Sequence, residues 1–142
     1  MNERNQQVAL DFLERVFNQG DLDAISQLTA ADGVDHQEPP GTDFQAHLRE
    51  VTTRLRTAFP DLRFTVHTIL SDGDTVAFRS TMTGTHLGPL QGLPPTGRAV
   101  SVAHMHFIRV VEGRGHDLWH VWDIPGMMRQ LGAGAPSAPA SR

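Results

Sequence analysis

Residues 84–98, with the sequence GTHLGPLQGLPPTGR, form a connection rich in glycine and proline. It joins two segments whose apolar and polar residues alternate as in strands, residues 75–84 and 99–111. A connection of this length within a compact chain folds only as a defined excursion, and such loops often border binding sites. We therefore expect two long neighbouring strands with a functional site close to the loop.

The two-residue period of strands continues on both sides of this loop. It begins at residues 63–69 and returns in residues 116–123. Turn sequences separate the strands, SDGD at 71–74 and EGRG at 112–115. Because consecutive turns join neighbouring strands, this half of the chain predicts an antiparallel meander.

The N-terminal part of the chain shows the helical period instead. Apolar stripes fall at residues 9–17, 22–28 and 44–59, and Pro60 ends the third. Residues 33–41 are predicted as a loop between the second and third helices. Helices followed by an antiparallel sheet give an α+β layout, because each helix must bury its stripe on one sheet face. We expect three N-terminal helices packed on a curved, mostly antiparallel sheet, forming a cone with a pocket at its mouth.

The composition predicts a single domain. The chain has 142 residues, of which 39% are hydrophobic and 20% charged, and this is enough for one core. We expect the domain to cover residues 1–132 and to be followed by a disordered tail, residues 133–142, rich in alanine, proline and serine. Cysteine is absent, which excludes disulfides, thiolate nucleophiles and cysteine-bound metals.

Charge and hydropathy exclude two classes of partner. The formal net charge is -4 and forms no basic stripe of the kind that binds a phosphate backbone. No apolar run approaches the roughly 18 residues of a membrane span, and the N-terminus does not read as a signal peptide. We therefore expect a cytoplasmic protein that binds neither nucleic acid nor membranes.

Asp123 is the first candidate for a catalytic group. It closes the last predicted strand, in an otherwise apolar segment beside two tryptophans. A carboxylate that loses water there becomes a stronger base, which suits removal of a proton next to a carbonyl. The alternative is that Asp123 only caps the turn that follows it, since aspartate is a common cap.

His104 and His106 are the second candidates, because residues two apart on a strand project from one face. Two imidazoles on one face can relay a proton, hydrogen-bond an enolate oxygen or bind a metal. A metal set would add His120 or Asp123, but the spacing resembles no known ligand run. The two histidines can also be structural.

Five further residues are candidates for binding a substrate. Two aromatic residues, Trp119 and Trp122, lie on opposite faces of the last strand, so one can stack on a planar ligand while the other packs elsewhere. The alternative for each tryptophan is packing in the core, without a role in binding. The alternative for each histidine below is an ordinary position in a loop or strand. The three histidines near predicted loop or strand ends are His36, His86 and His120.

Several short motifs, in order, resemble the SnoaL-like polyketide cyclase family. They are GDLD at 20–23, FPDL at 59–62, GTH at 84–86, GLPPTGR at 92–98, WD at 122–123 and QLG at 130–132. The resemblance implies a cone-shaped fold like that of nuclear transport factor 2 and ketosteroid isomerase, with oligomeric assembly and without cofactor or metal. It also implies a general acid/base aspartate near the end of the last long strand, a position that Asp123 matches, assisted by His104 or His106.

The resemblance implies that the protein closes a ring by intramolecular aldol condensation of a small, hydrophobic, polycyclic polyketide. The alternatives are a hydroxylase-type or hydrolase-type enzyme with the same pocket, or a non-catalytic binding protein. Because the chain has no tyrosine, the aspartate and tyrosine pair of steroid isomerases cannot operate here. If His104 and His106 face the pocket, Met105 and Phe107 face outward, which predicts a homo-oligomer, a dimer or tetramer, built on that apolar face.

Overall fold

The computed structural model describes residues 2–133, so the predicted tail lies outside the described residues beyond its first position. The helices are α1 (Asn2–Phe12), the π-helix η1 (Leu13–Asn18), α2 (Asp23–Leu28), α3 (Phe44–Ala58) and α4 (Ile124–Gln130). The strands are β1 (Thr29–Asp35), β2 (Arg63–Asp72), β3 (Thr75–Thr85), β4 (Ala99–Val111) and β5 (Arg114–Trp122).

The five strands form one sheet in the order β1-β5-β4-β3-β2. The antiparallel meander of β2 to β5 is confirmed. The prediction of a loop at residues 33–41 is wrong for residues 33–35. These residues belong to β1, which pairs in parallel with β5. The sequence of β1, TAADGVD, has no strand-like alternation and only two strand-forming residues, Thr29 and Val34, so its place in the sheet depends on pairing with β5.

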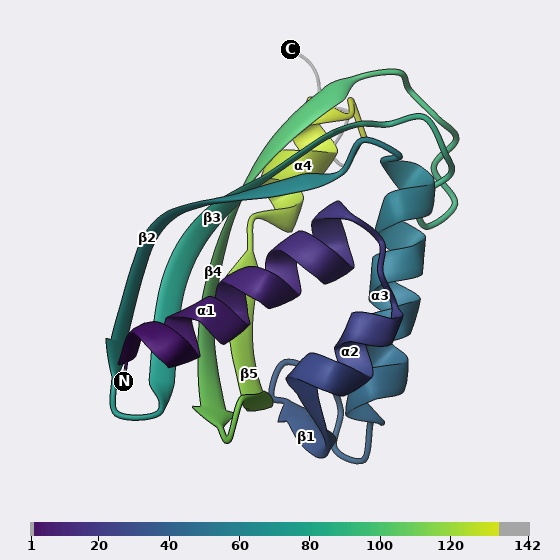
Figure 1. Ribbon diagram of the computed structural model, residues 1–142. Helices are drawn as coiled ribbons and strands as arrows, with labels where there is room; N and C mark the ends of the chain where they lie inside the picture. Colours follow the sequence, from purple (N-terminus) through teal and green to yellow (C-terminus); the bar gives the residue numbers. More distant parts are fainter. Residues whose placement is uncertain (1, 134–142) are drawn as a thin grey trace.

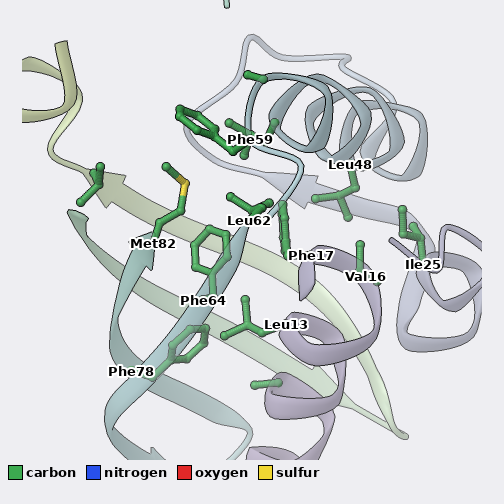
Figure 2. Close-up of a cluster of buried hydrophobic side chains, with 14 of the residues drawn as sticks. Leu13, Val16, Phe17, Ile25, Leu48, Phe59, Leu62, Phe64, Phe78 and Met82 are labelled. Carbon is green, nitrogen blue, oxygen red and sulfur yellow. The ribbon is translucent and has the colours of Figure 1, made fainter. Parts of the chain in front are cut away.

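The sheet bends around the helices, as predicted. Figure 1 shows α1 lying across the concave side of the sheet, with α3 beside it and β1 next to α2. The first helix is longer than its apolar stripe because α1 begins at Asn2, and it continues without a break into η1. Figure 2 shows the core between the helices and the sheet, where Leu13, Val16 and Phe17 of η1 meet Phe64 and Phe78 of the strands.

The loop at residues 84–98 is fastened to the end of α3. The backbone N–H groups of Leu87 and Gly88 both donate to the carbonyl oxygen of Ala58, at 2.9 and 3.1 Å. A Cβ atom at Gly88 would lie 2.1 Å from the carbonyl oxygen of Thr57, so only glycine permits this approach. Further along the loop, Gln91 has a φ of 46°, a strained conformation for a residue with a side chain, and it lines the cavity described below.

Candidate active site

A cavity of about 420 Å³ lies between the helices and the concave face of the sheet. Its size falls within the usual range for sites that bind small molecules. Most of its wall is apolar and aromatic, and includes Phe12, Phe17, Phe64, Phe78, Leu118 and Trp122. A cluster of titratable side chains also lines it, namely Asp35, Glu38, His47, His104, His106 and His120. The cavity therefore combines a hydrophobic wall with a concentrated group of acids and bases.

Strand pairing places the histidines of this cluster side by side. His104 and His106 are two apart on β4, and on β5 the residues opposite them are Trp122 and His120. All four side chains therefore share the face that lines the cavity. The rings of His104 and His106 stack with centroids 4.1 Å apart, and Trp122 stacks on His104 at 5.3 Å.

A chain of polar contacts links three of these residues, and we call it the relay: Asp35, His120 and His104. The Nε2 atom of His120 lies 3.2 Å from Oδ2 of Asp35, and its Nδ1 atom lies 3.3 Å from Nε2 of His104. The backbone N–H of Gln37 donates to Oδ1 of Asp35 at 2.9 Å, which fixes the carboxylate. With its proton on Nε2, His120 donates to Asp35 and keeps a lone pair on Nδ1.

Burial sets the charges of the cluster. It lowers the pKa of His104 to about 3, with a further contribution from the charge of His120, and it lowers the pKa of His106 well below its ordinary value. Both rings are therefore neutral near pH 7. Burial raises the pKa of Asp35, but the hydrogen bonds from His120 and Gln37 and the charges of His120 and His47 outweigh it, so this pKa is lowered. The site thus holds one ionised carboxylate, Asp35, and two neutral imidazoles, His104 and His106.

The prediction that Asp123 loses water is wrong. Its side chain is exposed, and it does not belong to the described cavity lining. It caps α4 instead, because Oδ1 accepts the backbone N–H of Gly126 at 2.9 Å. Near this point β5 presents Trp122 and the titratable His120 to the cavity, one and three positions earlier.

Three predicted substrate-binding residues also lie away from the cavity lining. His36 stacks on Trp119 with centroids 4.5 Å apart, and its Nε2 atom contacts Oδ1 of Asp117 at 2.8 Å, on the face of β5 that points away from the cavity. His86 is fully buried, and its Nδ1 atom accepts the backbone N–H of Thr96 at 3.2 Å. His86 therefore fastens the loop at 84–98. None of these three residues belongs to the described cavity lining, and a role for them in substrate binding stays a prediction.

Sequence reasoning missed Asp35 and His47. The sequence predicts a loop at Asp35 because residues 29–35 have no strand pattern, so nothing in the local sequence indicates that this side chain is buried. A signal for His47 does exist in the sequence: it lies three residues after Phe44 and four before Val51, on the apolar stripe of α3.

Two groups of side chains bring possible metal ligands within 4.8 Å of one another. In the first, His104, His106 and His120, the rings lie within 13 to 36° of parallel, so their in-plane lone pairs do not converge on one point as placed. This geometry suits a proton relay better than a metal cage. The second group is Asp35, Glu38 and His47. The absence of metal and cofactor from the reaction remains a prediction.

Residues 7–131 match the family model described as SnoaL-like polyketide cyclase. The chain belongs to this family. Its curved sheet and helices accordingly form the cone-shaped fold of nuclear transport factor 2-like proteins, as predicted.

Solved structures similar to this SnoaL-like chain cover nearly all of it. TsrD from Streptomyces laurentii is 26% identical with a TM-score of 0.85, covering 94% of this chain and 98% of its own. IdmH from Streptomyces antibioticus, described as a candidate polyketide cyclase, is 34% identical with a TM-score of 0.79, covering 91% of this chain and 99% of its own.

The curated relatives match over a shorter span. The aklanonic acid methyl ester cyclase DnrD of Streptomyces peucetius is 38% identical over 66 residues, which are 46% of this chain and 46% of the relative. The nogalonic acid methyl ester cyclase of Streptomyces nogalater is 43% identical over 49 residues, which are 34% of this chain and 37% of the relative. The matched part is thus less than half the length of either relative.

Proposed function

We propose that this SnoaL-like protein catalyses the intramolecular aldol condensation that closes a ring of an aromatic polyketide. The observation that carries the proposal is the relay of Asp35, His120 and His104 at the wall of an apolar cavity. Ring closure by an aldol step needs a base for a proton next to a carbonyl and a donor for the enolate oxygen. The relay offers both in one place.

In this proposal His120 is the base. Its Nδ1 lone pair faces Nε2 of His104 at 3.3 Å. When the substrate carbonyl oxygen accepts the Nε2–H of His104 instead, this lone pair becomes available to a substrate C–H. The proton passes from the substrate carbon to Nδ1, and the Asp35 carboxylate stabilises the imidazolium. The Nε2–H group of His104 then donates to the enolate oxygen. The carbanion forms a bond to the second carbonyl carbon, whose oxygen takes up a proton, so the product is an isomer of the substrate.

The cavity wall supports a planar, hydrophobic substrate. Phenylalanine side chains from η1, β2 and β3 face it, and Trp122 presents a ring that is already stacked on His104. Aromatic walls of this kind hold a flat polycyclic ligand by burial and stacking. They also exclude water from the carbanion, which would otherwise be protonated before the ring closes.

The charges of the wall support a substrate without a free carboxylate. Asp35, Glu38 and Glu50 line the cavity, and the cation Arg54 is already paired with Glu50 at 3.6 Å. A substrate carboxylate would be repelled by these groups, whereas an ester would not. We propose an esterified substrate, in keeping with the names of the curated relatives, which are methyl ester cyclases.

We also propose that the protein is a homodimer. Figure 1 shows β4 and β5 adjacent in the bent sheet, and four neighbouring side chains on their outer face are apolar and exposed. They are Met105, Phe107, Trp119 and Val121, with exposed fractions of 54%, 55%, 40% and 64%. An apolar face of this kind usually marks an interface, and a second copy joined by a two-fold axis would bury it on both chains.

No described helix has both the length and the apolar character to cross a membrane. A cytoplasmic location, and the absence of nucleic-acid and membrane partners, remain part of the proposal. Fractionation of the cells that produce the protein tests the location.

The test of the function is incubation of the purified protein with aklanonic acid methyl ester under oxygen-18 gas. The proposal predicts a product of unchanged mass and new retention time, formed faster than in a matched solution without protein. Incorporation of the label supports the hydroxylase alternative, and loss of the ester group supports the hydrolase alternative. A thermal shift without any product supports the non-catalytic binding protein.

A further inference from the structure

A second histidine faces the carboxylate of the relay from a helix. His47 lies on α3, and its Nε2 atom is 3.6 Å from Oδ2 of Asp35. The same oxygen contacts Nε2 of His120 on β5 at 3.2 Å. One carboxylate oxygen, on a side chain only 2% exposed, therefore lies near two imidazoles, one from helix α3 and one from strand β5.

The Nε2 atom of His47 is close to acids without being bound to them. Its distance to Oε2 of Glu38 is 3.7 Å, and this contact, like that with Asp35, exceeds the length of a hydrogen bond. A proton on this nitrogen is thus attracted by two carboxylates and remains free to be donated to a ligand in the cavity. His47 lines that cavity and is 13% exposed.

We propose that His47 is the general acid of ring closure, a role that rests on the proposed function. The carbon deprotonated by His120 attacks the second carbonyl carbon, a carbon–carbon bond forms, and the carbonyl π electrons move to the oxygen. His47 gives the proton on Nε2 to that oxygen as its negative charge develops. The aldol product leaves with the same atoms as the substrate, while His120 keeps one extra proton and His47 lacks one.

Asp35 provides the route that resets the two histidines. Its Oδ2 atom is the shared neighbour of both Nε2 atoms, so the Nε2 proton of His120 can pass through this carboxylate to His47. Exchange with water then moves the proton gained on Nδ1 of His120 back to Nε2. The low pKa of Asp35 fits a group that is ionised at rest and carries the proton only in transit. The next cycle then begins with a neutral base and a protonated acid.

The two proton transfers can be measured separately. Removal of the substrate proton is followed by NMR in D2O as the enzyme-dependent loss of the C–H signal from an analogue of aklanonic acid methyl ester whose electrophilic ketone has been reduced to an alcohol. This analogue can exchange its proton but cannot close the ring. Ring closure is followed with aklanonic acid methyl ester itself. His47→Gln, His120→Gln and the control His67→Gln, an exposed histidine on β2, are compared with the wild type.

We expect His47→Gln to retain exchange within about threefold and to lose about 100-fold or more in ring closure, the scale on which a general acid acts. His120→Gln should lose both proton exchange and ring closure, and His67→Gln should lose neither. Added imidazole should restore ring closure to His47→Ala, which a merely structural role would not allow.

If His47→Gln closes the ring like the wild type, or loses exchange as well while remaining folded by thermal unfolding, the inference is overturned. A wild type with neither exchange nor closure would instead refute the proposed function. Should His47→Gln unfold, imidazole rescue of His47→Ala and the same comparison with His47→Asn decide between these outcomes.

Discussion

Asp35 and His120 are adjacent because β1 pairs in parallel with the end of the meander. The Oδ2 atom of Asp35 lies 3.2 Å from Nε2 of His120, and the residue opposite Asp35 in the strand register is Leu118. The edge strand thus delivers a carboxylate to the face of β5 that lines the cavity. This contact orients the imidazole and stabilises its protonated form.

Replacing the carboxylate by an amide should therefore impair catalysis without disturbing the fold. We expect Asp35→Asn to lower kcat/KM for aklanonic acid methyl ester by about 100-fold, since the charge that supports His120 is removed. The matched control is Asp117→Asn, because Asp117 also contacts a histidine, His36, but outside the cavity. Steady-state kinetics should give a kcat/KM for Asp117→Asn within about twofold of the wild-type value. Equal losses in both variants would contradict the role of Asp35.

The buried histidines should make the protein less stable in mild acid. Burial lowers the pKa of His104 to about 3 and that of His106 well below 6.5, so the unfolded chain binds protons that the folded protein does not. The free energy of unfolding should therefore fall as the pH drops below about 6.5, by up to about 1.4 kcal/mol per pH unit for each histidine. Urea unfolding between pH 7.5 and 5 measures the slope. His106→Gln should flatten it and His67→Gln should not; an unchanged slope in His106→Gln would be evidence against this origin.

The sequence predicts the position of a site residue correctly when its local pattern agrees with its environment in the folded protein. The two-residue period is sufficient to place His104 and His106 on one face, with Met105 and Phe107 on the other, as the structure has them. Asp35 could not be placed, because its burial comes from pairing with a strand about 80 residues away in sequence, as the Asp35 contact to His120 illustrates.

For Asp123 the local sequence predicts burial, whereas the side chain is exposed. Its neighbours in sequence are apolar, but the solvent exposure of a strand's end depends on where the next element goes. The chain turns directly into α4, whose first N–H groups need an acceptor, and Asp123 supplies it. The family resemblance points to the end of β5, where the side chains that line this cavity are Leu118, His120 and Trp122 and not Asp123.

The acidic wall should make the protein select an ester over the corresponding acid. We expect KM for aklanonic acid to exceed that for its methyl ester by about tenfold or more, because the free carboxylate meets Asp35 and Glu38. Glu38→Gln should narrow this difference, because it lowers KM for the acid more than KM for the ester. Kinetics with the two compounds at equal pH and ionic strength provide the comparison. An acid that is used as well as the ester would rule out this selection.

The exposed face of β4 and β5 should be the dimer interface. We expect light scattering to give twice the 15.6 kDa of one chain at micromolar concentration, and Phe107→Glu to shift the mass toward one chain. Leu87→Glu, an equally exposed apolar position in the loop at 84–98, is the control and should remain dimeric. A wild type with the mass of a single chain would refute the dimer.

The most direct test of the central claim compares two residues of the same strand end, His120 and Asp123. Rates of ring closure with aklanonic acid methyl ester are measured for His120→Gln and Asp123→Asn, each verified as folded by circular dichroism. If His120 is the base, His120→Gln loses about 100-fold or more in kcat, while Asp123→Asn stays within about threefold of the wild type because asparagine also caps a helix. An active His120→Gln together with an inactive Asp123→Asn would contradict the account and return the catalytic role to Asp123.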